Sequence, residues 1–342
     1  MRTIPLGRND TISEIMLGTM TWGTQTGTED AHAQIELAIE RGVTWMDTAE
    51  MYPVNPVRAE TIGRTEEIIG AWIARGNGGR IRVATKHSGE GSAARDGAPI
   101  SPASIPEAIE GSLRRLGVDH VDLYQFHWPN RGSYQFRKNW SYRPEGAHDP
   151  ILQDLADCVG ALEREVERGT IGAFGPSNES AWGLTQLARI AGDGPARPVS
   201  IQNEYSLLCR LADTDLAETM HYEGVTMLAF SPLAAGILTG KYQDGTVPEG
   251  SRRSINETMG GRWSDRVRPA VDAYHTLARE HGVDPVHMAL AWLRTRPFHC
   301  SAILGATTKE QLAHGLGAVE VTLSEELMAA IDAVHKAHPM PY

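Results

Sequence analysis

The chain has 342 residues, of which 41% are hydrophobic and 22% charged, and its formal net charge is −11. A chain this acidic, without a tract rich in lysine and arginine, argues against nucleic acid binding, which depends on clusters of cations at phosphates. No apolar run approaches the roughly 18 residues needed to cross a bilayer, and three cysteines without a CxxC pair suit a reducing compartment. We therefore expect a cytoplasmic protein without a membrane or nucleic acid partner.

Short β-branched, apolar runs alternate with amphipathic stretches along the whole chain. Helical patterns are clearest at 30–42, 106–117, 155–169 and 309–319, and Ser104 is placed to cap the second of them. Strands separated by helices predict a parallel sheet. Eight such strands close into a (β/α)8 TIM barrel, with an open doubly wound sheet as the alternative. The expected strands are 16–20, 44–49, 80–86, 121–127, 170–177, 199–206, 226–232 and 299–306.

Three further regions depart from this alternation. Residues 3–16 contain a turn-like GRND between two apolar strips and predict a β-hairpin before the barrel. Segments 129–150 and 239–268 are long and each follows a strand, so both should lie on the functional face. An extra helix is expected at 323–337. Because no linker divides the chain, we interpret residues 1–342 as one domain.

Four polar residues end three consecutive expected strands. Asp47 and Tyr52 close 44–52, Lys86 closes 80–87, and His127 closes 121–128. The active sites of barrels collect at such C-terminal strand ends. The four types also form a chemical set: a phenol can give a proton, an ammonium can lower its pKa, a carboxylate can hold the ammonium, and an imidazole can orient a carbonyl.

Each of these residues has a structural explanation when taken alone. A strand-end aspartate can cap a turn, a tyrosine is usually half-buried packing, a lysine is usually solvated, and a histidine can satisfy a backbone carbonyl. Structural polar groups outnumber catalytic ones. Their occurrence together at successive strand ends favours the functional interpretation.

Eight motifs, in order and over essentially the whole chain, resemble the aldo-keto reductases. Singly each is weak, but together they are specific, and DTAEMYP and QFHWP look most like the Tas-type bacterial branch related to the potassium-channel β-subunits. The motifs are LGTMTWG (17–23), DTAEMYP (47–53), the strand-terminal Lys86, QFHWP (125–129), SN (177–178), IQNEYSLL (201–208), SPLAAGILTGKY (231–242) and LGATTKEQL (304–312).

The resemblance implies an NADPH-dependent carbonyl reductase built on a TIM barrel, with no Rossmann domain. That agrees with the lack of a GxGxxG after a strand. By resemblance Tyr52 is the general acid, Lys86 and Asp47 tune it, and His127 orients the substrate oxygen. No metal is required.

The resemblance also assigns the cofactor pocket. Ser177, Asn178 and Gln202 would hold the nicotinamide carboxamide, and Tyr205 would stack on the nicotinamide ring. The loop after the seventh strand would wrap the pyrophosphate, with Lys241 and Arg252 as cations. The remaining cofactor residues are Thr19, Met20, Phe230, Ser231, Pro232, Leu233, Ala234 and Gly236, together with Gly305, Thr307, Lys309 and Gln311 at the adenosine phosphate.

The chain departs from the resembling proteins in one place, near the adenosine-phosphate residues. Resembling proteins often have Glu-Asn where this chain has His314-Gly315, and 304–315 contains no arginine. The resemblance makes NADPH the expected cofactor, and this departure leaves NADH open.

An apolar, aromatic mouth that includes Trp22 and Trp128 suits small aldehydes or ketones as substrates. Two other function classes remain. One is a nucleotide-sensing protein of the channel-β type with little turnover, and the other is a barrel enzyme acting on a sugar phosphate. The latter does not explain SN, QN and SPLAAG together. The sequence predicts neither the oligomeric state nor the physiological substrate.

Overall fold

Eight parallel strands form a closed barrel, as expected from the sequence. The computed structural model describes residues 1–54, 56 and 58–342. Its strands follow one another around the barrel in chain order, and backbone bridges Phe174–Pro198 and Ser177–Gln202 join the first and last members of the row. This closure excludes the open sheet. The strands are β3 (Ile15–Gly18), β4 (Trp45–Asp47), β5 (Arg82–His87), β6 (Val121–Phe126), β7 (Ile171–Pro176), β8 (Ser200–Glu204), β9 (Thr226–Phe230) and β10 (Cys300–Gly305).

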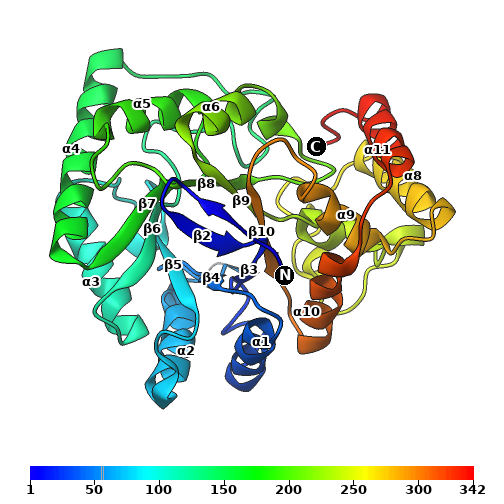
Figure 1. Cartoon of the computed structure of the whole chain (residues 1–342), viewed down its shortest axis with the longest axis horizontal. Helices are drawn as coiled ribbons and strands as arrows, with labels where there is room; N and C mark the ends of the chain where they lie inside the picture. The colour runs from blue at the N-terminus through cyan, green and yellow to red at the C-terminus, as the bar shows by residue number, and fades with distance from the viewer. Residues whose placement is uncertain (55, 57) are drawn as a thin grey trace.

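Helices surround the barrel (Figure 1). Those that connect successive strands are α1 (Thr28–Glu40), α2 (Arg64–Trp72), α3 (Ser104–Leu116), α4 (His148–Arg168), α5 (Ala181–Ala191), α6 (Asp215–Glu223) and α9 (Pro285–Leu293), and α10 (Lys309–Leu316) follows β10. Two further helices, α8 (Val267–Glu280) and the C-terminal α11 (Glu325–Ala337), lie against each other beside α9. The extra C-terminal helix was expected.

One boundary prediction is wrong. Ser104 is the first residue of α3 rather than its cap, and the cap residue is Ala103. The Ser104 hydroxyl instead bonds with Ser101 and with Nε2 of His87. The hydroxyl therefore links the start of α3 to β5 and does not cap the helix.

A β-hairpin of β1 (Thr3–Leu6) and β2 (Asp10–Ser13) covers one end of the barrel, where Figure 1 shows it in front of the strands. Trp45 donates its indole N–H to the carbonyl of Thr11 at 3.2 Å, and Thr226 donates its hydroxyl to the carbonyl of Pro5 at 3.0 Å. Both partners lie at the starts of barrel strands. The hairpin therefore closes the N-terminal end and leaves the C-terminal end for function.

Two hydrophobic clusters result from this arrangement. An inner cluster fills the barrel above the hairpin and contains Leu6, Ile12, Met16, Trp45, Ala84, Leu123, Leu228 and Ile303. A much larger outer cluster lies between strands and helices. Burial of the barrel wall on both sides explains why apolar side chains predominate in most of the strands, although β5, β6 and β8 also contain polar residues along their length.

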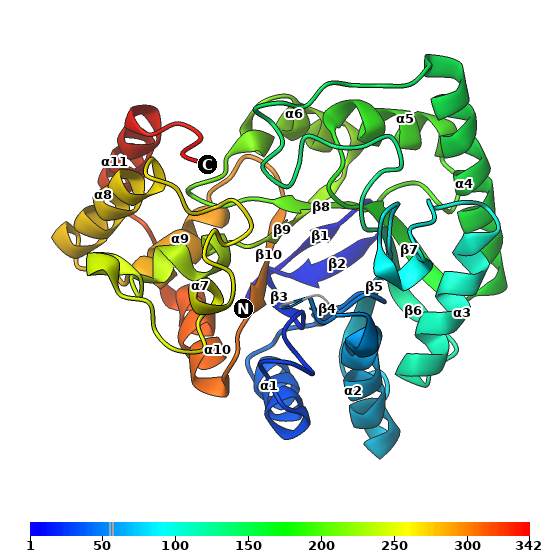
Figure 2. The ribbon, with the colours of Figure 1, turned by 180° about the vertical axis from the view of Figure 1, so that it is seen from behind.

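The two long segments lie at the C-terminal end of the barrel, seen from behind in Figure 2. Segment 129–150 runs from β6 to the first turn of α4, and 239–268 contains only the short helix α7 (Arg252–Ile255) and a 3₁₀ turn before α8. Among the helices of the described residues, none is long and apolar enough to cross a membrane.

Candidate active site

Lys86 joins three of the four strand-end residues. Its Nζ donates hydrogen bonds to Oδ2 of Asp47 at 2.7 Å, to the carbonyl of Thr48 at 2.7 Å and to the hydroxyl of Tyr52 at 3.4 Å. The lysine side chain is fully buried and that of Asp47 nearly so. Burial lowers the pKa of Lys86, and the Asp47 carboxylate opposes that lowering. The structure thus brings together the predicted carboxylate, ammonium and phenol.

The phenol of Tyr52 keeps its proton at neutral pH. Burial raises the pKa of Tyr52 well above its ordinary 10.0, the Asp47 carboxylate raises it further, and Arg252 opposes the rise. From the sequence we expected Lys86 to lower this pKa. Loss of solvent dominates instead, because water stabilises a phenolate better than a buried site does.

His127, directly after β6, completes the group. Its ring centre lies 5.7 Å from that of Tyr52, edge to face. Burial lowers the pKa of His127 well below 6.5, and the charge of Lys86 lowers it further. Nδ1 has no hydrogen-bond partner among the described residues. A neutral imidazole beside a protonated phenol can serve a substrate oxygen without carrying charge. We call Asp47, Tyr52, Lys86 and His127 the tetrad.

The second oxygen of Asp47 is held by amides from other strands. Gln202 in β8 donates to Oδ1 at 2.8 Å, and Gln125 in β6 donates to it at 3.3 Å. Gln202 also donates to Oε1 of Gln125 at 3.0 Å. Gln125 belongs to the QFHWP motif, but its residue type and position did not indicate a role. Its amide connects the tetrad to the predicted cofactor residue Gln202.

Ser177 and Asn178, after β7, have one polar atom to offer a ligand. Ser177 donates its hydroxyl to the carbonyl of Gln202 at 2.7 Å, and Asn178 donates its amide N–H to the carbonyl of His127 at 2.8 Å. The amide oxygen of Asn178 is buried and has no partner in the described part of the chain. An unpaired buried acceptor is costly, and this one could take an N–H from a carboxamide. This acceptor therefore fits the carboxamide of a nicotinamide.

The loop after β9 has an unusual backbone. Ser231, Ala234, Ala235 and Gly236 all have positive φ, between 48° and 92°. Non-glycine residues rarely adopt this conformation and concentrate at functional sites. A Cβ added to Gly236 would lie 3.0 Å from Nζ of Lys241, which places that ammonium against the loop.

Arg252 lies on the tetrad side of the same segment. Its charge opposes the rise in the pKa of Tyr52, and burial lowers the pKa of Arg252 itself to about 10. Of the other predicted residues in this loop, Leu233 is half-buried and packs against the outer hydrophobic cluster, and Pro232 is buried.

Tyr205 does not lie where the sequence placed it. Its ring is fully buried, stacks on Trp292 at 5.2 Å between centroids, and its hydroxyl binds Asp213. It therefore has no surface for a nicotinamide ring. Phe230 is half-buried at the C-terminal end of β9 and packs against the inner cluster. It is the aromatic side chain of the expected set that remains accessible on this face.

The predicted adenosine-phosphate residues lie together where β10 ends and α10 begins. The side-chain oxygen of Gln311 accepts hydrogen bonds from the backbone N–H of Thr307 at 3.1 Å and from its hydroxyl at 3.0 Å. Thr308 caps α10. Lys309 and Gly305 are exposed. Gly315, noted as a departure, is needed for packing, because a Cβ there would lie 2.8 Å from Leu304.

The residues predicted around the nicotinamide face differ in accessibility. Trp22 is 0% exposed in the outer cluster and has no accessible surface for a substrate, whereas Trp128 is half-buried and donates its indole N–H to the carbonyl of Glu90 at 3.0 Å. Thr19 donates its hydroxyl to the backbone oxygen of Asp47 at 2.8 Å. Met20 is half-buried beside it in the chain. Trp128 is thus the better placed of the two tryptophans.

A cluster that sequence reasoning missed lies at the end of β8. Glu204, 3% exposed, accepts hydrogen bonds from Arg262 at 2.6 and 2.8 Å, from Arg137 at 2.9 Å and from the hydroxyl of Tyr342 at 3.0 Å. The two arginines come from the two long segments and the tyrosine is the last residue. We call these four residues the rim cluster. Its only sequence signal was a strand-end carboxylate.

A cavity of about 420 Å³ lies beside the site, between 129–155 and the outer side of β6 and β7. It reaches Ser177, but none of the tetrad residues lines it. The cavity is therefore not the place where the tetrad would act.

Comparison with known proteins identifies relatives for this arrangement. The model of the aldo/keto reductase family matches residues 14–336. The chain is 41% identical over 337 residues to protein tas of Escherichia coli, covering 96% of each chain. It is 29% identical to a probable voltage-gated potassium channel subunit beta of Oryza sativa, covering 98% of this chain and 96% of that one. It is also 29% identical to aflatoxin B1 aldehyde reductase member 2 of Rattus norvegicus, covering 89% and 79%.

Proposed function

This chain belongs to the aldo/keto reductase family, a family of oxidoreductases, and on that basis we propose that it reduces small aldehydes or ketones to alcohols with NADPH, Tyr52 being the proton donor. One observation carries the proposal. Buried Lys86 contacts both the Asp47 carboxylate and the Tyr52 hydroxyl, so three groups suited to proton transfer share one site.

NADPH, when bound, supplies the hydride that the carbonyl carbon receives. Tyr52 gives its proton to the carbonyl oxygen, for which its raised pKa is appropriate, because an acid must be protonated before it acts. As the proton leaves, negative charge develops on the phenol oxygen, 3.4 Å from the Lys86 ammonium. Asp47 holds that ammonium in position. Lys86 therefore stabilises the charge that develops during the step rather than the resting phenol.

His127 would orient the substrate. Its neutral ring can donate one N–H to the carbonyl oxygen while the edge-to-face contact with Tyr52 fixes its direction. A charged imidazole at this position would compete with the phenol as the acid. The lowered pKa of His127 supports the assignment of proton donation to Tyr52.

The cofactor contacts follow from the donors and acceptors present. Asn178 would accept from the carboxamide, and Phe230, in place of Tyr205, would pack on the nicotinamide ring. Lys241 and Arg252, with the backbone of 231–236, would neutralise the pyrophosphate. At 305–311, a phosphate bound at the start of α10 would accept a hydrogen bond from the backbone N–H of Thr307, which now donates to the side chain of Gln311.

NADPH is preferred over NADH in this proposal because Lys309 lies beside that position. Residues 304–315 contain no arginine, so the preference rests on one exposed ammonium. We expect the discrimination to be modest, since a solvated charge contributes little.

We also propose that residues 1–342 form one domain and that the protein works in the cytoplasm. The hairpin closes the barrel and α11 packs on α8, so each terminal segment is attached to the barrel. The three cysteines are free and buried, as expected for thiols kept in a reducing compartment.

Fluorescence titration with NADPH and NADH tests the proposal, followed by mixing the tighter binder with a panel of small aldehydes and ketones. We expect saturable binding of NADPH and loss of the reduced-nicotinamide absorbance when a carbonyl is added. Failure of both nucleotides to bind would refute the proposal.

A nucleotide-sensing role is the second candidate, because relatives across nearly the whole chain are described as potassium channel subunits. Binding without turnover on any carbonyl would favour it. A pull-down with NADPH present and absent would then look for a partner whose binding depends on the nucleotide.

A further inference from the structure

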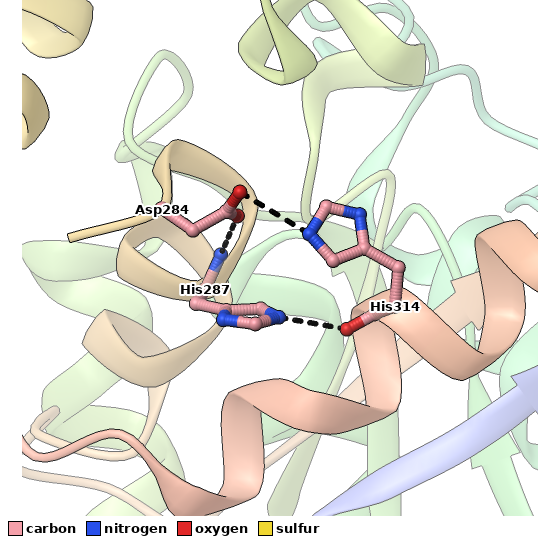
Figure 3. Close-up of side chains that lie close together, drawn as sticks. All are labelled: Asp284, His287 and His314. Carbon is pink, nitrogen blue, oxygen red and sulfur yellow. Dashed lines mark hydrogen bonds and ion pairs between the residues drawn. The ribbon is translucent and has the colours of Figure 1, made fainter.

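Three polar side chains form a separate cluster on the outer helices. Asp284 caps the N-terminus of α9, His287 lies in the first turn of that helix, and His314 lies in α10 (Figure 3). One ring nitrogen from each histidine and one carboxylate oxygen lie within 4.8 Å of one another. The sequence did not suggest this cluster, because His314 is 27 residues beyond His287.

Two of the three side chains already have the spacing of metal ligands. Oδ1 of Asp284 accepts from the backbone N–H groups of Val286 at 2.9 Å and His287 at 3.0 Å, which fixes the carboxylate. Its Oδ2 faces Nε2 of His314 at 3.2 Å. Bonds of about 2.0–2.1 Å in a tetrahedral zinc site separate neighbouring ligand atoms by about 3.3 Å. This pair would need little movement to accept an ion.

His287 is held close but makes one competing contact. Its Nε2 lies 2.8 Å from the carbonyl oxygen of His314, so in that state Nε2 carries the proton and donates it. A Cβ added to Gly317 would lie 3.0 Å from this nitrogen, which shows how closely the ring packs on the backbone there. In that state the lone pair of the ring is on Nδ1; moving the proton to Nδ1 frees the lone pair of Nε2 and removes the hydrogen bond to the carbonyl oxygen.

We propose that Asp284, His287 and His314 bind one divalent transition-metal ion of the Zn²⁺ type, with water completing the coordination. Two imidazoles and one carboxylate suit zinc and the other late first-row divalent metals. Magnesium and calcium prefer oxygen ligands alone. Three protein ligands with one open position form a recognised zinc arrangement.

The ion can reach this site from solvent. The side chain of His314 is 49% exposed and that of Asp284 is 37% exposed. Bound metal would link the start of α9 to α10. It would stabilise the folded protein, because ligands from two helices converge only in the native state.

The competing explanation is a simple ion pair between Asp284 and protonated His314. The two explanations differ in what they require of His287. The ion pair does not use its ring, whereas the metal site needs a nitrogen from it.

Calorimetric titration of chelator-treated protein with ZnCl₂ at about pH 7.5, where histidines are largely neutral, tests the proposal. We expect one Zn²⁺ per chain, a melting temperature that rises with zinc, and no response to MgCl₂. Equal binding of Mg²⁺ would overturn the assigned metal class.

Three variants assign the ligands. His314→Ala, His287→Ala and Asp284→Asn, the last of which keeps a capping oxygen, should each weaken zinc binding at least about 10-fold, since even partners outside the first coordination sphere cost 10–100-fold. His148→Ala is the matched control, because His148 is an exposed histidine 2.8 Å from Asp149 with no second histidine in its pair. Undiminished binding in the three variants, or the same loss in His148→Ala, would show that zinc binds elsewhere.

Discussion

Two buried carboxylates, Asp47 and Glu204, each end a barrel strand and each is only 3% exposed, yet they connect different parts of the molecule. The side chains bound to Asp47 come from β5, β6 and β8, so its partners are fixed by the barrel itself. Those bound to Glu204 come from segments 129–150 and 239–268 and from the last residue. The same ion-pair chemistry thus positions a reacting group in one place and loops in the other.

The difference has a consequence for kinetics. Changes in the tetrad should lower the rate of the chemical step. Changes in the rim cluster should loosen the loops and so affect substrate binding more than the chemical step. The comparison can be tested residue by residue.

Tyr52→Phe should have the largest effect. It removes the proposed acid and should lower kcat about 10²–10⁴-fold, the usual contribution of a general acid, with NADPH affinity nearly unchanged. The control is Tyr124→Phe, since Tyr124 is also buried but its hydroxyl has no partner among the described residues. Near-normal kcat in Tyr52→Phe would show that the acid is another group.

Asp47→Asn should come next. It leaves the fully buried Lys86 ammonium without its anion. Loss of one partner of a buried ion pair lowers the free energy of unfolding by about 3–5 kcal/mol. We expect the upper part of that range, measured by chemical denaturation, together with a fall in kcat. Retained kcat with lost stability would mean that Asp47 supports the fold and not the proton transfer.

Glu204→Gln should lower the free energy of unfolding by about 3 kcal/mol, the lower end of the same range. The loss is smaller because the side chains of its arginine partners retain 8% and 15% exposure. We expect KM to rise more than kcat falls, and limited proteolysis to cut 129–150 and 239–268 faster. Glu165→Gln is the matched control, since Glu165 is a buried carboxylate paired with Arg168 in α4. A similar rise in KM in the control would attribute the effect to general destabilisation.

Glu204 should also contribute to acid sensitivity. Burial raises its pKa, but Arg262 and Arg137 outweigh burial and hold the pKa of Glu204 below its ordinary 4.5. Its stabilisation is therefore complete above about pH 4.5 and is lost as pH falls through the lowered value. Stability measured against pH should fall less steeply below pH 4.5 in Glu204→Gln than in the unmodified chain.

Tyr342→Phe should have the smallest effect. It removes one hydrogen bond to a charged group, about 1.5 kcal/mol, while both arginines still hold Glu204. We expect a small fall in melting temperature and a small rise in KM. An effect as large as that of Glu204→Gln would mean that the C-terminal residue, and not the carboxylate, fixes the loops.

The strand ends were predictable because they follow a local rule. A barrel strand is largely buried on both faces and its C-terminal end lies on the functional side, so Asp47, Lys86 and His127 stand out as titratable residues at or directly after the ends of buried runs. The same rule marked Glu204, but a single carboxylate does not disclose its partners. These lie 58, 67 and 138 residues away in the chain.

Tyr205 shows where the same reasoning fails. It follows β8 directly, so its position in the chain suits a ligand contact. Whether a ring after a strand turns toward the barrel axis or toward the helices is decided by packing, and here Trp292 provides the stacking partner outside the barrel. Phe230, the last residue of β9, packs instead against the inner cluster.

The pKa values show the same division between what the residue types predict and what the folded structure decides. The residue types alone predicted a phenol close to an ammonium, and the structure places them 3.4 Å apart. The direction of the shift at Tyr52 depends on how much water the folded chain excludes, which no local pattern encodes.

The sequence by itself determined the barrel, the hairpin, the extra helix and the strand-end residues of the tetrad, because periodicity and polarity are local properties of the chain. Only the tertiary structure decided which loops share Glu204, which of the rings of Tyr205 and Phe230 stays accessible and which histidines meet Asp284. Those contacts join residues that are distant in the chain, and their geometry arises from the closing of the barrel and the packing of helices around it.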